Sequence, residues 1–212
     1  MPKRTHEDSL ETKRSILESA KRLFSRRGFE RTSLSDIAKY AGVTRGAIYW
    51  HFENKEELLL ALYDSVAHEQ FSFNLLYEAG QPSEPDPLGK LKRWLCSFVE
   101  EGNDEFLNSP LVSMMISIVN GNSGNELLRE KIHERAVSRH EAVIAALKNA
   151  AQKGQMPHNL NTEVAAEHLA IFSVGYMHQS RMNMAKEFKK NFSYFVDVEF
   201  ETIKQFTNAS VS

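Results

Sequence analysis

A chain of 212 residues with 42% apolar and 25% charged side chains has an ordinary globular composition and is long enough to bury a core. Its one cysteine excludes an intrachain disulfide and a thiolate metal cluster, and its longest apolar run is far too short to cross a bilayer. The polar start lacks the apolar stretch of a signal peptide. We therefore expect a cytoplasmic protein with no metal, no cofactor and no membrane partner.

The charge is distributed unevenly along the chain. The whole chain carries −2, but its first 60 residues hold twelve basic and nine acidic side chains, a net of +3, which leaves −5 for the remainder. A basic N-terminal module on an acidic body is typical of a protein that binds a polyanion at that end. A helix face exposed to solvent gives similar counts, so the asymmetry alone decides nothing.

The first elements in chain order are two helices with clear ends. Residues 9–27 place apolar side chains at helical spacing, and Gly28 follows as a helix stop. Ser33 and Asp36 then form the pattern of a capping box, with Asp in place of Glu, at the start of a short helix that Gly42 ends.

Further helices are predicted for the rest of the chain. Thr44 can cap a second short helix over 45–51, and a long helix is expected from 55 to about 79. Three prolines within 80–87 break the helical pattern. No strand pattern competes beyond this break, where the predicted helices cover 88–101, 105–119, 125–153, 161–185 and 188–207.

The second short helix is poorly apolar and is therefore the first candidate for a functional surface. Ile48 and Phe52 lie four residues apart and can anchor it on neighbouring helices. The opposite face carries Arg45, which can fork onto guanine or a phosphate, and Tyr49, which offers a ring to a thymine methyl group and a hydroxyl to a phosphate. Gly46 leaves room for close approach of a duplex. This chemistry favours DNA as the partner.

Helix starts on either side of this surface add candidate phosphate contacts. Lys55 opens the long helix, where free N–H groups and the macrodipole favour an anion, and Thr32 and Ser33 lie at the start of the first short helix. Each of these residues taken singly is better explained as a plain cap or a solubility residue. The arrangement as a whole indicates a clamp on DNA.

The run from Thr32 to Phe52, followed by Asn54-Lys55-Glu56-Glu57-Leu58, closely resembles the TetR/AcrR family of bacterial repressors. The resemblance extends over about residues 10–65, and 42–52 is especially similar to the AcrR-type branch that represses multidrug efflux pumps. It implies an all-α fold of about nine helices. In such a fold, an N-terminal three-helix helix-turn-helix domain precedes a larger helical domain for ligand binding and dimerisation.

The resemblance also implies a domain layout and a set of DNA contacts. A basic arm would cover 1–9, the DNA-binding domain 10–65 with its motif at 33–52, and the C-terminal domain 66–212. The second short helix would lie in the major groove of a palindromic operator. The implied DNA-binding residues are Thr32, Ser33, Thr44, Arg45, Gly46, Ala47, Tyr49, Trp50, His51 and Lys55. Trp50 fits DNA contact and packing against the scaffold equally well.

Two apolar stripes near the C-terminus suit the four-helix dimer interface that the resemblance implies. A monomer could bury these stripes internally, but five helices around one core seldom need so many phenylalanines on the last one. The predicted interface residues are Leu169, Phe172, Phe188, Phe192, Phe195, Val196, Ile203 and Phe206.

Methionine and aromatic side chains on the middle helices are the candidates for an effector pocket. Such a lining suits flat, apolar or amphipathic ligands, although a dry helical core explains each residue equally well. The candidates are Trp94, Phe98, Met114, Met115, Ile118, Phe172, Tyr176 and His178.

The sequence therefore predicts a homodimeric, ligand-responsive repressor that controls an efflux or stress-response operon. It contains no nucleophile elbow, phosphate-binding glycine loop or metalloprotease pattern, so we do not expect an enzyme. The alternative is a TetR-like DNA-binding protein with an architectural or division-linked role.

Overall fold

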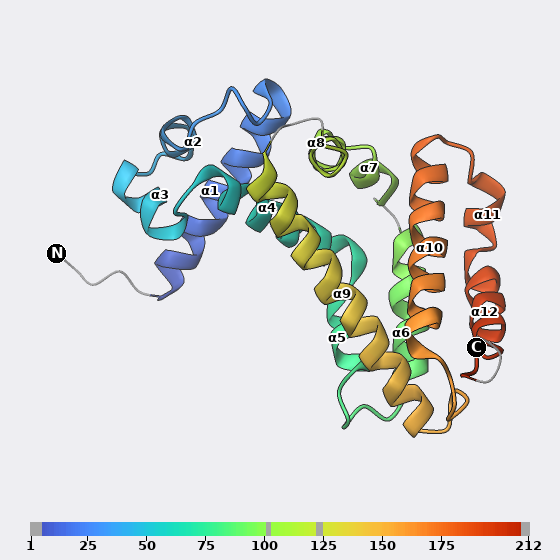
Figure 1. Cartoon of the computed structure of the whole chain (residues 1–212). Coiled ribbons are helices and arrows are strands. Elements are labelled where there is room, and N and C mark those ends of the chain that lie inside the picture. The colour runs from blue at the N-terminus through green and yellow to red at the C-terminus, as the bar shows by residue number, and fades with distance from the viewer. Residues whose placement is uncertain (1–5, 101–102, 122–124, 209–212) are drawn as a thin grey trace. The chain divides into compact units, whose positions relative to one another are not determined.

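The computed structural model describes residues 6–100, 103–121 and 125–208, which form a helical protein (Figure 1). These residues contain twelve α-helices and one 3-10 turn, and their one isolated β-bridge joins Leu160 to Thr207. None of the helices they form is long and apolar enough to pass through a membrane. The predicted all-α class is confirmed.

Contacts between Cα atoms divide the chain into two compact units, and neither unit is continuous in sequence. The first comprises Met1–Ala67 and Ser109–Arg129, and the second comprises His68–Asn108 and Glu130–Ser212. The segment 109–129 belongs to the first unit because α8 packs on α1. This division differs from the continuous C-terminal domain over 66–212 that the sequence suggested, since periodicity does not reveal which distant helix an apolar face covers.

The first unit contains three N-terminal helices, the start of α4, and α8. Their bounds are α1 His6–Arg27, α2 Leu34–Ala41, α3 Arg45–His51, α4 Lys55–Phe71 and α8 Pro110–Val119. The face of α1 predicted from its spacing is buried, and the core of the unit includes Ile16, Ala20, Phe24, Ile37, Ile48 and Leu58. Residues 6–9, expected in the basic arm, belong to α1, whose first turn carries Glu7 and Asp8 where acidic groups favour a helix start. The rest of that arm lies outside the described residues.

The second unit contains the remaining helices. Their bounds are α5 Phe73–Ala79, α6 Pro87–Cys96, η1 Ser97–Val99, α7 Asn103–Leu107, α9 Glu126–Gln152, α10 Thr162–Arg181, α11 Lys186–Lys190 and α12 Phe192–Ile203. The division between the units falls within α4 and within α9, so each of these helices contributes to both. Fully buried side chains of the second unit include Leu76, Leu91, Leu95, Leu147, Phe192 and Phe200.

Three helices predicted as continuous are divided in the structure, which is why the described residues contain twelve α-helices and not about nine. Ser72 adopts a left-handed conformation (φ 45°) and separates α4 from α5. Ser109 caps α8, and Pro110 occupies a first-turn position where its missing N–H costs nothing. Asn191 separates α11 from α12. Apolar periodicity continues across all three breaks and therefore did not reveal them.

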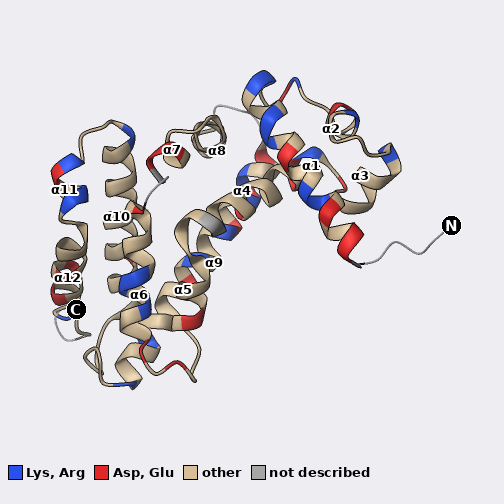
Figure 2. Cartoon of the chain, turned by 180° about the vertical axis from the view of Figure 1, so that it is seen from behind, with Lys and Arg blue, Asp and Glu red and all other residues tan. Residues whose placement is uncertain are grey.

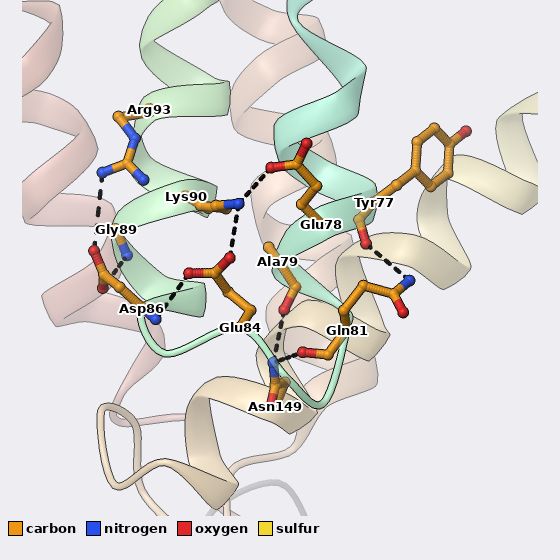
Figure 3. Close-up of polar contacts among 10 residues, drawn as sticks. All are labelled: Tyr77, Glu78, Ala79, Gln81, Glu84, Asp86, Gly89, Lys90, Arg93 and Asn149. Carbon is orange, nitrogen blue, oxygen red and sulfur yellow. Dashed lines mark hydrogen bonds and ion pairs between the residues drawn. The ribbon is translucent and has the colours of Figure 1, made fainter.

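The proline-rich segment between α5 and α6 is held by a network of polar contacts (Figure 3). The buried amide of Asn149 on α9 donates to the carbonyls of Ala79 (2.9 Å) and Gln81 (2.7 Å). The amine of Lys90 on α6 pairs with Glu84 at 2.7 Å and also with Glu78. This segment is thus an ordered turn that fixes α5 and α6 against α9.

Candidate nucleic-acid interface

The first short helix, α2, is closed at both ends by its own sequence. The backbone N–H of Asp36 donates to the Ser33 hydroxyl (3.1 Å), and the backbone N–H of Ser33 donates to the Asp36 carboxylate (3.0 Å), which completes the predicted capping box. Hydrogen bonds from the hydroxyl and then the backbone N–H of Ser33 lower the pKa of Asp36. At the other end Gly42 has φ +68°, a left-handed conformation that glycine adopts without steric cost. The turn into the next helix is therefore locally determined.

The second short helix, α3, is anchored by two side chains. The hydroxyl of Thr44 accepts a hydrogen bond from the N–H of Ala47 (3.1 Å) and caps the helix start. Ile48 and Phe52 are buried, as their spacing predicted. In a helix of seven residues these two anchors fix the orientation, so Arg45, Tyr49 and Trp50 face solvent, while Ala47 and His51 are partly buried.

The outer face of α3 carries an arginine and two aromatic side chains in solvent. Tyr49 is 46% exposed and Trp50 is 72% exposed, while the Arg45 guanidinium lies 5.6 Å from the centre of the Tyr49 ring. A Cβ added at Gly46 would meet nothing closer than the Thr44 hydroxyl at 4.0 Å, so this part of the helix surface is open. Figure 2 shows basic residues along α1 and at the start of α3, interspersed with acidic ones.

Thr32 and Lys55, like the capping residues Ser33 and Thr44, make internal bonds. Thr32 is buried, and its hydroxyl donates to the carbonyl of Gly28 (2.8 Å). The amine of Lys55 donates to the backbone carbonyl of Phe29 (2.8 Å) and lies 4.2 Å from the centre of the Phe29 ring. Both residues therefore hold the loop between α1 and α2, and Thr32 has almost no side-chain surface left for a ligand.

A groove of about 650 Å³ brings part of the predicted set together. Of the predicted residues it contains Thr32, Ser33, Arg45, Tyr49 and Lys55. Thr44, Gly46, Ala47, Trp50 and His51 lie on or next to α3 but outside this groove, and the rings of Trp50 and His51 meet edge to face at 4.6 Å.

Sequence reasoning missed three neutral or basic polar residues that line the same groove, which also contains the acidic side chains of Glu30, Asp36 and Glu53. The three missed residues are Arg31, Ser35 and Asn54. Their signal was present in the sequence, because each lies within two residues of a predicted contact at a helix start. Capping patterns select one residue per helix start and pass over its neighbours.

The predicted effector residues form three separate groups. Trp94 and Phe98 belong to an aromatic cluster of the second unit with Phe71 and Phe106, at ring distances of 5.0–5.5 Å. Phe172 and Tyr176 lie in another cluster around Phe188 and Phe192, and His178 is exposed. The α8 candidates Met114, Met115 and Ile118 are in the first unit. The structure therefore does not place the eight candidates around one pocket.

Four of the predicted dimer-interface residues are buried inside their own chain. Leu169, Phe192, Val196 and Ile203 have at most 2% exposure, so they offer a partner no surface, and this part of the interface prediction is corrected. Phe172, Phe188, Phe195 and Phe206 are partly buried. The solvent-facing apolar side chains of α10 and α12 are Ile171, Val174, Tyr194 and Val198.

A short capped helix with Arg45 and Tyr49 on its outer face, preceded by a second short helix and a glycine turn, defines a helix-turn-helix DNA-binding protein. The family described as "Bacterial regulatory proteins, tetR family" matches residues 16–62. The regulator TtgR of Pseudomonas putida is 37% identical over 173 residues, which cover 82% of this chain and 80% of TtgR. The chain belongs to the TetR family of bacterial transcriptional regulators.

Two further relatives agree with this assignment. The transcriptional regulator AcrR of Shigella flexneri is 31% identical over 78% of this chain and 76% of its own. The structure of the SmeT–triclosan complex superposes with a TM-score of 0.71 at 26% identity, covering 91% of both chains. The predicted family and its helical architecture are thereby confirmed.

Proposed function

We propose that this protein is a homodimeric repressor of an efflux or stress-response operon, released from a palindromic operator by a small apolar ligand. The exposed pair Arg45 and Tyr49 on α3 carries the proposal, because a guanidinium and a phenol fixed on a short helix fit base edges in a major groove. SmeT, a relative at 26% identity, is described as the repressor of a Stenotrophomonas maltophilia multidrug efflux pump. This supports repression and an efflux target.

On DNA, α3 lies in the major groove with Arg45 on guanine and Tyr49 on a thymine methyl group. The backbone of Gly46 and the side chains of Thr44 and Lys55 face phosphates on either side. The start of α2 at Ser33, where free N–H groups favour a phosphate, contributes a further contact.

The second copy joins through the exposed apolar faces of α10 and α12. Ile171 and Val174 are 73% and 61% exposed, and Tyr194 and Val198 lie on the solvent side of α12. Such a patch in water favours burial against an identical patch about a two-fold axis. A dimer then presents two copies of α3 to half-sites about 34–36 Å apart.

The effector binds in the second unit at the aromatic cluster around Trp94. The indole N–H of Trp94 is buried and has no hydrogen-bond acceptor among the described residues. Because an unpaired buried donor is costly, a ligand with an acceptor group would gain a hydrogen bond by entering this cluster. In SmeT the bound molecule is triclosan, an aromatic compound.

Release from DNA follows from differential affinity. The helices α4 and α9 each belong to both units, so a rearrangement of the aromatic cluster can reach the DNA-binding helices through either of them. A ligand that prefers the conformation unable to span two half-sites removes the dimer from its operator.

The proposal is tested by mapping genomic fragments bound by the protein, and by a reporter that places the bound promoter upstream of a measured gene. We expect a few palindromic sites, repression of the reporter, and loss of both with aromatic efflux substrates. Binding spread over many sites without any change in transcription would overturn the repressor assignment and support the architectural alternative.

A further inference from the structure

A second groove of the first unit lies between the end of α1, the loop 28–31 and α8; it is open to solvent and has a volume of about 550 Å³. Its floor is apolar, with Phe24, Phe29 and Ile118 almost fully buried and Met114 partly exposed. This volume lies within the range of pockets that bind drug-sized molecules.

The rim of this α8 groove carries an excess of positive charge. The guanidinium groups of Arg27 and Arg31 are exposed, and neither has a carboxylate within ion-pair distance among the residues that the structure describes. Glu30 is the one acidic residue of the lining. An apolar floor below two unpaired guanidinium groups is complementary to a molecule with a hydrophobic body and one carboxylate.

The loop 28–31 is a common wall of two grooves. Glu30 and Arg31 line both the α8 groove and the groove that contains Arg45 and Tyr49, which we call the DNA-facing groove. The loop is held from the DNA side by Lys55, which donates to the Phe29 carbonyl. A molecule bound in the α8 groove therefore contacts the loop backbone and the Arg31 side chain, which also form part of the DNA-facing groove.

We propose that the α8 groove binds an amphipathic carboxylate, aromatic or aliphatic, and that its occupation weakens DNA binding. The carboxylate engages Arg27 and draws Arg31 away from the DNA side, while the hydrophobic body lies on Phe29 and Met114. All residues of this groove belong to the first unit, which carries the helix-turn-helix and is called the DNA-binding unit below, whereas Trp94 belongs to the second. Only the effect of this groove on DNA, and not the binding of the carboxylate itself, rests on the proposed function.

The location is tested by photolabelling the full-length protein with 4-(trifluoromethyl-diazirinyl)benzoate and identifying the labelled peptides by mass spectrometry. We expect labels within 24–31 and 110–118, and much weaker labelling by the corresponding neutral benzyl alcohol. Labels confined to 68–108 or 130–208, or no labelling of the groove at millimolar benzoate, overturn the site.

The chemistry is tested by the affinity of the same benzoate for matched variants, measured by calorimetry. Arg27→Gln and Met114→Glu are expected to weaken binding about tenfold, because each removes the attraction for the anion or places a like charge beside it. Arg26→Gln on the same helical turn and Ile116→Glu on the outer face of α8 lie outside the groove and should bind as the natural chain does. The proposal is overturned if all four variants bind the benzoate with the same affinity. It is also overturned if the two controls lose as much affinity as the two groove variants.

A final measurement separates this proposal from the function on which its DNA effect rests. Benzoate should lower the affinity of the natural chain for its operator and leave that of Arg27→Gln much less affected. If the chain binds no specific DNA, the repressor assignment fails while the labelling and calorimetry still decide the site. If the benzoate binds the groove but leaves operator affinity unchanged, the regulatory part of the proposal is wrong.

Discussion

The helices α3 and α12 are both rich in aromatic residues, but they differ in which of them are buried. In α3 the aromatic residues Tyr49 and Trp50 face solvent, while the buried anchors are Ile48 and, directly after the helix, Phe52. In α12 the phenylalanines Phe192 and Phe200 are the buried anchors. The difference shows that residue type alone does not separate a binding face from a core face. A core face differs from a binding face in the number of neighbouring helices that pack against it.

The strongest test of this contrast is a pair of substitutions two residues apart on α12. Phe192→Ala should reduce the free energy of unfolding by about 3–5 kcal/mol, because it leaves a cavity among the rings around Tyr176. Tyr194→Ala removes an exposed ring and should alter only the concentration dependence of unfolding. Urea denaturation at several protein concentrations measures both. Equal losses at all concentrations would show that Tyr194 is not on a dimer surface.

The dimer surface itself is tested by placing a charge in its centre. Val174→Glu should weaken dimerisation by about a hundredfold or more, because the carboxylate would be desolvated without a partner. Analytical ultracentrifugation measures the association, and Ala136→Glu on the exposed side of α9 serves as the control. A Val174→Glu chain that sediments as a dimer at the same concentration as the natural chain would place the interface elsewhere.

For α3, the exposed face should matter for DNA and not for folding. Arg45→Ala or Tyr49→Ala should each reduce the free energy of operator binding by about 1–3 kcal/mol, since each removes a direct contact to a base. Tyr40→Ala, an equally exposed tyrosine at the end of α2 that does not line the DNA-facing groove, is the matched control. Gel-shift titrations with specific and scrambled duplexes measure the loss. Unchanged affinity in both α3 variants would count against this helix as the reader.

The DNA-binding unit was predictable because its signals are local. A capping box at Ser33, a glycine turn at Gly42 and the i, i+4 pair Ile48 and Phe52 each act within a few residues, so the sequence determines both the helices and the exposed face. The internal bonds of Thr32 and Lys55 were not predictable, because their acceptors depend on how the loop 28–31 folds back.

In the second unit the deciding contacts are long-range. The apolar stripes of α10 and α12 fit a core and an interface equally well until the contact partners of each side are known. The same limit applies to α8, whose apolar pattern did not reveal that the helix packs on α1. Periodicity identifies an apolar face but carries no information about which element covers it.

A smaller effect is expected at Trp94, which can be interpreted as a packing residue or as part of the effector site. Trp94→Phe removes the buried N–H, which should leave the thermal stability of the free protein unchanged or raise it. Affinity for aromatic ligands that carry a hydrogen-bond acceptor should fall by about 0.5–1.5 kcal/mol, and affinity for those without an acceptor should not change. Calorimetry on matched ligand pairs measures this. A large loss of thermal stability would instead show that Trp94 serves packing and not ligand binding.

The smallest effect, and the one that separates two roles of a single side chain, is expected at Lys55. Lys55→Met should reduce by about one the slope of the logarithm of the DNA-binding constant against the logarithm of salt concentration, equally for specific and non-specific duplexes, if the amine contacts a phosphate. Lys39→Met, an exposed lysine at the end of α2 outside the DNA-facing groove, is the control and should leave the slope unchanged. The amine of Lys55 also holds the Phe29 carbonyl, so a lower melting temperature with an unaltered slope would mean that it only fixes the loop 28–31. A change in both quantities would mean that the amine which orders the loop also contacts the phosphate, and the loop and the bound duplex would then share one positive charge.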